Sequence, residues 1–577
     1  MARGLTVLEA STLSVLLALA GTTLVGYRFG DSNHGITVPI LKRLMDPSLY
    51  PGDAMVATAE RFPTVFYRAL ALVLPGTDWI PLAFFVLYVV SIAATLAGAY
   101  RIGRWAGGPA AGVLALLFAF PVRIGLAGEA LYRVAFSHSH LASALTIWAI
   151  VWFLEGRRML PILALSLGAY NHLLYSVYML VPMMLVVLWE RREAGTRRTL
   201  QLLAAGALPL VPLALWAISK GAPMTPEWLE LLRLRSAHHS FPSFFGEDLP
   251  EAAALLALAA LALSRLHVEK RRLVMFFLAG TALQFVLGTV FTELYPIKAM
   301  LQYQPHRSWR FLMLILRGVA AAGIVEGWRA GGIGRAVSIA TGTVLMVPGL
   351  EPLLPVSVAL EAVLGRPAPA AWARLVAAGV LVGVEGWGDR PLRYDFVGEL
   401  LPRLMSTTAL GAAAVATLIV VGREGRFLRH ALAVAAAALT LFSLGPEAYG
   451  RARARWESGA WREAQDWVRL HTPKDAVLLT PPKEAGFRVF SERTVVGEWK
   501  DGTQQYFDDA FVKQWGARME MLGGDEYPKL SDDRLLSLAR AYRASYIVLS
   551  AKPERRDLVE VFRNRAFAVY EARRRAT

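Results

Sequence analysis

Long apolar runs separated by short charged loops fill the chain up to about residue 450. After a first run at 13–25, the clearest lie at 79–99, 107–122, 139–154, 159–170, 174–189, 199–217, 251–264, 273–291, 311–325, 336–349, 372–386, 404–421 and 430–445. Several are shorter than the about 20 residues that a perpendicular membrane span needs. The pattern predicts an α-helical polytopic membrane protein of about 13–15 transmembrane helices, the higher number including a short or re-entrant segment at 352–365.

The pattern changes in the tail of the chain. Residues 451–577 carry 43 charged side chains in 127 positions, whereas residues 1–450 carry 63 in 450. Helical patterns at 457–470, 506–521 and 531–543 alternate with strand patterns at 476–480, 494–497, 545–550 and 567–571. This alternation is typical of a small, mostly parallel sheet. We therefore expect a transmembrane domain over 1–449 and a soluble C-terminal α/β domain over 450–577.

Basic side chains indicate the sidedness of the membrane part. Clusters of Arg and Lys fall in alternate loops, at 101–104, 157–158, 191–198, 265–272, 329–335 and 423–429. The positive-inside rule assigns such loops to the cytoplasm. The prediction is a multi-pass protein of the cytoplasmic (inner) membrane, with a cytoplasmic N-terminus and an extracytoplasmic C-terminal domain. The outer segments are then 27–78, 123–138, 218–250 and 292–310.

Composition narrows the classes of function. Of the 577 residues 55% are hydrophobic, and the net charge is +16. The positive charge lies in loops between apolar runs and gathers on no single predicted face, so we expect no nucleic-acid partner. The chain has no cysteine, which excludes disulfides, thiolate nucleophiles and cysteine-ligated metals.

The long first outer loop, 27–78, concentrates acidic and turn-forming residues. Asp31 lies a few residues past the first span, and 46–53 reads Asp-Pro-Ser-Leu-Tyr-Pro-Gly-Asp. The apolar positions within 36–44 share one stripe of an amphipathic helix, and a second amphipathic stretch lies near 60–74. Together with the soluble tail domain, these features resemble the GT-C superfamily of membrane glycosyltransferases.

This resemblance implies transfer of a sugar from a polyprenyl-phosphate donor to an unidentified acceptor at the outer face, next to membrane lipid. An inverting transfer needs a carboxylate that accepts the proton of the incoming nucleophile. Asp31 is the candidate base and Asp53 a second candidate acid, and capping of the following helix is the alternative for Asp31. Some members of the superfamily use a divalent cation, so Mg²⁺ or Mn²⁺ is a candidate cofactor, with Asp53 as its holder.

Basic residues of the outer segments are candidates for binding substrate and lipid phosphate. They are His34, Arg133, His138, Lys298, His306, Arg307 and Arg310. Guanidinium forks match phosphate oxygens, and an interfacial belt of snorkelling side chains is the structural alternative. The Asn171-His172 pair, between two short apolar runs, is either a tight turn or a polar cluster that faces a cavity.

Two other classes of function fit the same chain. A transporter or flippase of lipid-linked glycans fits the number of spans, and a non-catalytic envelope assembly protein fits the soluble tail. Transporters place charged residues within their spans, whereas the acidic residues here fall mostly in outer loops. In the tail, Arg488 and Trp499 contact either a sugar or acceptor, or only their own domain.

Overall fold

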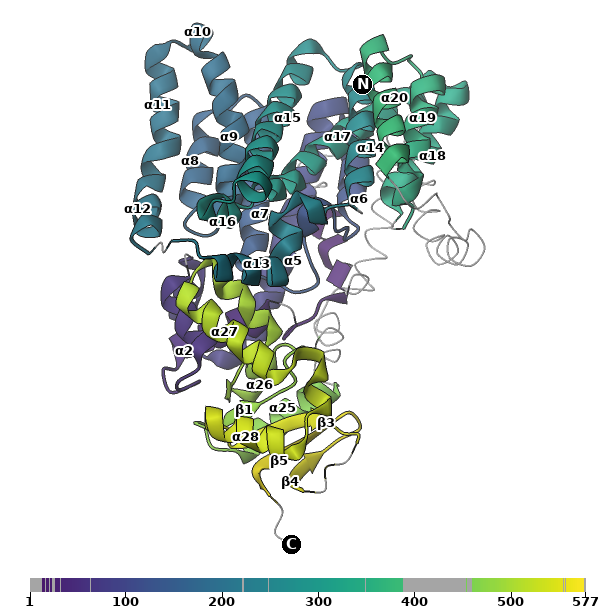
Figure 1. Ribbon diagram of the computed structural model, residues 1–577. Helices are drawn as coiled ribbons and strands as arrows, with labels where there is room; N and C mark the ends of the chain where they lie inside the picture. Colours follow the sequence, from purple (N-terminus) through teal and green to yellow (C-terminus); the bar gives the residue numbers. More distant parts are fainter. Residues whose placement is uncertain are drawn as a thin grey trace.

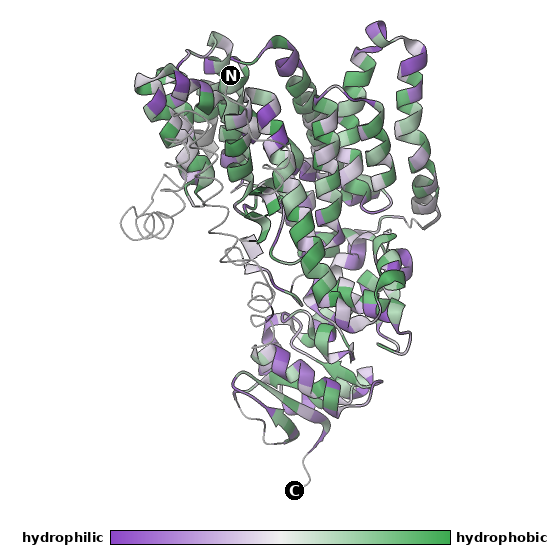
Figure 2. Cartoon of the chain, turned by 180° about the vertical axis from the view of Figure 1, so that it is seen from behind, coloured by the Kyte–Doolittle hydropathy of each residue, from purple (hydrophilic) through white to green (hydrophobic). Residues whose placement is uncertain are grey.

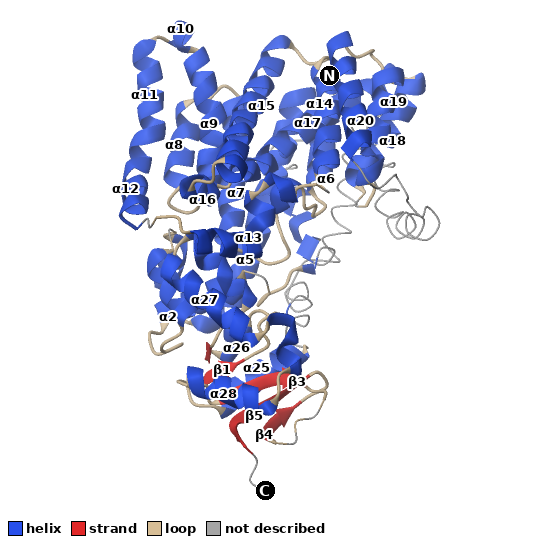
Figure 3. Ribbon diagram, in the orientation of Figure 1, coloured by secondary structure: helices blue, strands red, loops and turns tan. Residues whose placement is uncertain are grey.

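The computed structural model describes residues 13–387, 453 and 459–574, apart from positions 16, 20, 23–25, 32, 63, 221–222, 247, 348, 554 and 556. The spans predicted at 404–421 and 430–445 lie outside the described residues. A bundle of helices forms one end of the molecule, and a smaller unit with a sheet forms the other (Figures 1 and 3).

The bundle consists of the helices that the apolar runs predict. They are α5 (Ile80–Gly107), α6 (Pro109–Ala119), α7 (His138–Leu154), α8 (Met159–Gly168), α9 (Leu173–Trp189), α11 (Thr196–Ala207), α12 (Val211–Lys220), α14 (Leu249–Leu263), α15 (Val268–Thr289), α17 (Trp309–Ala330), α18 (Gly332–Met346), α19 (Leu354–Leu364) and α20 (Ala371–Trp387). Within the described residues, 4 helical stretches are long and apolar enough to cross a membrane, and further apolar helices are shorter. Figure 2 shows hydrophobic residues along most of these helices and a more mixed pattern in the tail. The predicted fold class is confirmed.

Helix α17 is the central element of the bundle. Nearly all of its side chains are buried, and it packs against α5, α6, α14 and α18. Glycines allow this close packing, because a Cβ atom at Gly107 would lie 2.6 Å from the Cβ of Ala322. By contrast, α11 and α12 lie at the margin of the bundle (Figure 1), and the Thr196–Trp216 stretch is only 17% buried.

Short helices from the predicted outer segments lie between the bundle and the tail domain (Figure 1). They are α2 (His34–Met45), α3 (Ala54–Ala57), α4 (Phe66–Val73), α13 (Pro226–Ser240) and α16 (Lys298–Tyr303). Helix α10 (Arg191–Ala194), from a predicted cytoplasmic loop, lies at the opposite end of the bundle. The structure thus separates the two sets of loops, and the side of the membrane that each faces stays a prediction.

Helix α2 is more deeply buried than its amphipathic pattern predicts. All residues from His34 to Lys42 are buried, because the tail domain covers the face that the sequence assigns to the polar side. The Lys42 Nζ atom lies 2.6 Å from a carboxylate oxygen of Glu492 and donates to the carbonyl of Val489 at 2.9 Å. Lys42, which lies outside the predicted apolar stripe, therefore makes an interdomain contact.

The tail domain is a five-stranded sheet with helices. Its elements are α25 (Ala460–His471), β1 (Val477–Leu479), α26 (Phe487–Ser491), β2 (Thr494–Val495), the 3-10 helix η11 (Trp499–Tyr506), α27 (Asp509–Leu522), α28 (Asp532–Tyr542), β3 (Tyr546–Ser550), β4 (Leu558–Arg563) and β5 (Phe567–Arg574). The strand order is β2-β1-β3-β5-β4. Strand β1 is parallel to β2 and β3, whereas β5 is antiparallel to β3 and β4.

The expectation of a mostly parallel sheet is therefore wrong, because the sheet is mixed. The predicted strands do not include β4, which forms the antiparallel pair with β5 at one edge of the sheet. Only Leu558 in this strand is fully buried, so an edge position leaves β4 without the alternating apolar pattern that identifies a strand.

A buried arginine joins the tail domain to the first outer loop. The Arg488 Nε donates to Asp53 at 2.6 Å, and its two terminal nitrogens donate to Asp501 at 3.0 Å each. Asp53 also caps α3 by accepting backbone N–H bonds from its first turn. Burial alone would lower the pKa of Arg488, but Asp501, Asp53 and Glu498 raise it above its ordinary value. The guanidinium is thus a permanent cation within a cluster of carboxylates.

Substitution of Arg488 by methionine tests this contact. We expect Arg488→Met to lower the free energy of unfolding by about 3–5 kcal/mol, because it leaves buried carboxylates without their counter-charge. Thermal unfolding and limited proteolysis of the purified protein in detergent measure the loss. The control Arg540→Met, on an exposed face of α28, should change stability by less than about 0.5 kcal/mol. Equal effects of the two variants would contradict the assignment.

Candidate functional site

Two adjoining cavities lie where the bundle, the outer segments and the tail domain meet. The first has a volume of about 420 Å³ and is lined by α9, α12, α16 and the start of α27. The second has a volume of about 290 Å³ and is lined by α2, the segment before α7, α13 and η11. Both cavities are lined by Phe62, His138, His172, Arg307, Tyr506 and Phe507. They form one site with two chambers, which we call the apolar chamber and the polar chamber.

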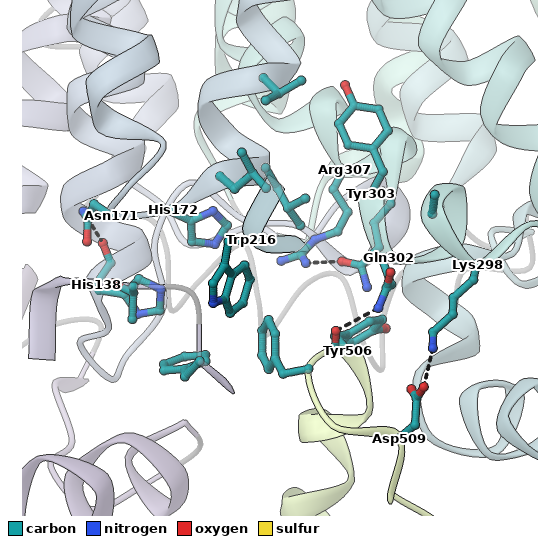
Figure 4. A pocket seen from close by; sticks show the side chains of 18 residues that line it. His138, Asn171, His172, Trp216, Lys298, Gln302, Tyr303, Arg307, Tyr506 and Asp509 are labelled. Atoms are coloured by element: carbon teal, nitrogen blue, oxygen red, sulfur yellow. Dashed lines mark hydrogen bonds and ion pairs between the residues drawn. The ribbon is translucent and has the colours of Figure 1, made fainter. Parts of the chain in front are cut away.

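The apolar chamber lies between helices of the bundle and the tail domain. Leucine and valine side chains of α9 and Trp216 of α12 line it. Figure 4 shows Trp216 and Arg307 around the same space, with Tyr506 of the tail below them. At one side, the Lys298 ammonium pairs with the carboxylate of Asp509. The chamber thus borders α12, which belongs to the least buried of the long apolar stretches.

Glu129 is the centre of the charge pattern in the polar chamber. The residue is 2% exposed, and its carboxylate oxygens lie 2.6 Å from Arg307 Nη2 and 3.1 Å from Arg310 Nη1. The Tyr175 hydroxyl donates to the same carboxylate at 3.2 Å. Burial alone would raise the pKa of Glu129, but Arg307 and Arg310 lower it to about 2. Glu129 is therefore an anion that holds two guanidinium groups at the chamber wall.

Positive charge exceeds negative charge in the polar chamber. Among the described residues that line it, Glu129 is the one carboxylate. The basic lining residues are Arg133, Arg235, Arg307, Arg310 and Lys500, together with the histidines His138, His140, His172, His238 and His239. Such a chamber suits an anionic ligand, because guanidinium and ammonium groups donate charge-assisted hydrogen bonds to oxyanions.

The structure brings most of the basic candidates from the sequence to these chambers. Arg133, His138, Arg307 and Arg310 line the polar chamber, and Lys298 lines the apolar one. These five come from two separate outer segments of the chain, 123–138 and 292–310. Their spatial proximity makes them one candidate site, and their roles in binding stay proposals.

Two histidine candidates line neither chamber. His34 accepts a hydrogen bond from the Gly30 N–H at 3.0 Å, and its Nε2 lies 2.6 Å from the Phe136 carbonyl oxygen. Burial lowers the pKa of His34 to about 4, so it links the first and second outer segments as a neutral side chain. His306 is buried against phenylalanine rings, and its Nε2 lies 3.2 Å from the Thr289 hydroxyl.

The two acidic candidates have different environments. Asp53 is 2% exposed, and its oxygens accept from Arg488 and from backbone N–H groups. The Asp31 side chain is 48% exposed, with its Oδ2 3.7 Å from Arg28 Nη1. Burial lowers the pKa of Lys500 to about 8, and Asp31 opposes this shift. Neither Asp31 nor Asp53 lines either chamber.

Several lining residues are not among the site candidates that the sequence predicts. These are Glu129, His238, His239, Lys500, Gln504 and Tyr506. A signal existed for Glu129, which stands between arginines in an outer segment, but Lys500 and Gln504 belong to a tail domain with no recognisable motif. For Asn171 and His172 the sequence left open a tight turn or a polar cluster that faces a cavity. The structure shows both, since the pair lies at a turn and lines the apolar chamber.

The described residues offer no binding site for a divalent cation. Among the described residues, no group of three or more His, Asp or Glu side chains is arranged to bind a metal ion. The candidate holder Asp53 is occupied by Arg488. We therefore derive no step through Mg²⁺ or Mn²⁺.

Comparison with known families and proteins gives one match in the tail. Residues 459–522 match a family described as a domain of unknown function (DUF6798). The match spans α25 to α27 and includes η11, which lines the polar chamber. No curated protein matches the chain.

Solved structures include several that are similar over most of the chain. ArnT from Cupriavidus metallidurans, bound to undecaprenyl phosphate, is 13% identical with a TM-score of 0.46, over 97% of each chain. The apo oligosaccharyltransferase of Archaeoglobus fulgidus is 11% identical with a TM-score of 0.38, over 94% of this chain and 70% of that one. The oligosaccharyltransferase AglB of the same archaeon, in complex with an inhibitory peptide and a dolichol-phosphate, is 12% identical with a TM-score of 0.36, over 94% and 69%. At these identities and TM-scores the likenesses carry no inference about function, which rests on the two chambers.

The ion pairs of Glu129 predict a dependence of stability on pH. The folded-state pKa of about 2 lies below the ordinary value of 4.5, so this stabilisation is present above about pH 4.5 and is lost as the pH falls towards 2. Glu129→Gln should therefore cost about 3 kcal/mol at pH 7, and the difference from the wild type should shrink below pH 4.5.

Thermal unfolding in detergent at several pH values measures this difference. The control Glu526→Gln, on the exposed surface of the tail, should leave stability within about 0.5 kcal/mol. A gap between Glu129→Gln and the wild type that stays constant down to pH 3 would contradict the assignment.

Proposed function

We propose that this protein is a membrane glycosyltransferase of the GT-C kind, which takes a sugar from a polyprenyl-phosphate donor. One observation supports this function best: an apolar chamber adjoins a cationic polar chamber, and Arg307 lines both. A polyprenyl-phosphate-linked sugar has the same order of chemistry, namely an apolar chain, a phosphate and a polar sugar.

The donor binds across the two chambers. Its lipid chain lies in the apolar chamber against α9 and Trp216, and it enters from the bilayer beside the weakly buried α12. Its phosphate meets Arg307, whose planar fork suits phosphate oxygens, with Lys298 nearby on the same wall. Glu129 orients Arg307 and Arg310 and offsets the repulsion between their like charges.

Asp31 acts as the general base in this proposal. The acceptor oxygen attacks the anomeric carbon and gives its proton to the Asp31 carboxylate, while the bond between that carbon and the phosphate oxygen breaks. The lipid phosphate leaves with the electron pair, and the cationic groups around Arg307 stabilise the charge that develops on it. Attack on the face opposite the phosphate inverts the anomeric configuration. The site faces the outside of the cytoplasmic membrane.

Asp53 has a structural role in the same proposal. Its carboxylate is shared between Arg488 and the first turn of α3, so it holds the first outer loop against the tail domain. If Asp53 accepted a proton, it would lose the negative charge that pairs with Arg488.

Transfer of radiolabelled sugar from polyprenyl-phosphate donors tests the function and its base. In membranes or nanodiscs, Asp31→Asn should lower the rate of transfer by about 10²–10⁴-fold, the usual contribution of a general base. The control Asp525→Asn, on the exposed tail surface, should keep the wild-type rate. A wild-type rate in Asp31→Asn would remove Asp31 from the mechanism, and no transfer by the wild type from any donor would overturn the proposed function.

Binding of undecaprenyl phosphate tests the phosphate contact separately from catalysis. Arg307→Lys keeps a positive charge for Glu129 but loses the fork, so the Kd for undecaprenyl phosphate should rise about tenfold. The control Arg469→Lys, exposed on α25, should bind like the wild type. Microscale thermophoresis in detergent gives both constants, and an unchanged Kd in Arg307→Lys would exclude Arg307 as the phosphate ligand.

A further inference from the structure

Three cationic side chains of the polar chamber have no counter-charge in direct contact. Arg133 comes from the segment before α7, Arg235 from α13 and Lys500 from η11 of the tail domain. The guanidinium of Arg133 donates to the Gly128 carbonyl, and Arg235 Nε donates to the Trp499 carbonyl at 3.0 Å. Among the residues that the structure describes, none of the three forms an ion pair with a carboxylate. This distinguishes them from Arg307 and Arg310, which both pair with Glu129.

The three charges lie close enough to perturb one another. Burial lowers the pKa of Lys500 to about 8, with Arg235 and Arg133 adding to the shift and Asp31 opposing it. Like charges held together in a partly desolvated space cost free energy. An anion bound among them would remove that cost and raise the pKa of Lys500 again.

The side-chain amide of Gln504 is a second indication that the polar chamber binds an anion. Gln504 is 1% exposed and lines the polar chamber, yet its Nε2 has no hydrogen-bond partner among the described residues. Buried donors in native structures are nearly always paired. A ligand oxygen in the chamber would supply the missing acceptor.

We propose that Arg133, Arg235 and Lys500, with the amide of Gln504, form a second anion subsite in the polar chamber. It binds a carboxylate or phosphate group carried by the transferred sugar or by the acceptor. The subsite lies in the chamber to which the proposed function assigns the sugar, so this inference rests on that function for its source of ligand. It also gives the segment 459–522 a role, because Lys500 and Gln504 complete the site from the tail domain.

Binding of inorganic phosphate to the full-length protein tests the subsite directly. The purified protein in detergent is first saturated with undecaprenyl phosphate, which occupies Arg307, and phosphate is then titrated calorimetrically. Lys500→Gln should weaken phosphate binding about tenfold, as expected for loss of one charge-assisted hydrogen bond. The control Lys529→Gln, exposed on the tail, should bind phosphate like the wild type. Equal phosphate binding by the wild type and Lys500→Gln would overturn the proposal.

The pH dependence of phosphate binding gives a second readout. Lys500 is charged below its pKa of about 8 and loses its proton above it, so binding by the wild type should weaken between pH 7 and pH 9 relative to Lys500→Arg, which shares the titration of phosphate itself. Lys500→Arg stays protonated over this range and should lose that dependence. The titratable and charged groups that face Lys500 are Arg133, Arg235, Asp31 and His238. The two arginines do not titrate between pH 7 and pH 9, and burial lowers the pKa of His238, so it is neutral there. The same pH profile in Lys500→Arg and the wild type would overturn the role of Lys500.

Donors with and without a charged sugar distinguish the two sources of the anion. If the sugar carries it, Lys500→Gln weakens binding of a polyprenyl-phosphate glucuronate but not of a polyprenyl-phosphate glucose. If the acceptor carries it, both donors bind Lys500→Gln like the wild type, while phosphate binding is still weakened. Failure of the wild type to bind undecaprenyl phosphate would instead count against the proposed function and leave the phosphate titration as an independent test.

Discussion

The buried ion cluster of Arg488 is the contact on which the site depends. Its guanidinium joins Asp53 of the first outer loop to Asp501 of the tail domain with none of the three exposed to solvent. Asp501 belongs to η11, the same short helix that carries Lys500 and Gln504 into the polar chamber. Both chambers have the tail domain as a wall. Without this docking contact, neither chamber would be enclosed.

A second charge cluster organises the wall that the bundle contributes. Glu129 joins Arg307, which lies just before α17, and Arg310, in the first turn of α17, to the segment before α7. The two clusters are complementary, because in one a cation gathers carboxylates and in the other a carboxylate gathers cations. Glu129 carries one negative charge against the two guanidinium groups, so this wall keeps a net positive charge for a ligand, to which the other basic residues of the polar chamber add.

The local pattern of apolar and polar residues predicted most helices and strands. Where the structure differs from the prediction, contacts between segments far apart in the chain explain most of the differences. The apolar runs identify the bundle helices because lipid and protein interior both select apolar residues, whereas the edge strand β4 carries no such pattern. Lys42 lies on the polar side of its amphipathic helix. It is buried only because the tail domain, over 400 residues later in the chain, covers that side. Arg307 was found because arginines on a predicted outer segment depart from the positive-inside trend. Nothing local marks Lys500, whose surroundings arise from three separate segments.

The two chambers border different surroundings, one beside the weakly packed α12 and the other between α13 and the tail domain. In the proposed function, the spent lipid carrier departs sideways into the bilayer while the glycosylated product departs along the tail. Neither has to wait for the other to clear a common exit. Such a layout suits a sequential kinetic scheme, in which donor and acceptor occupy the protein together and the two products leave in either order.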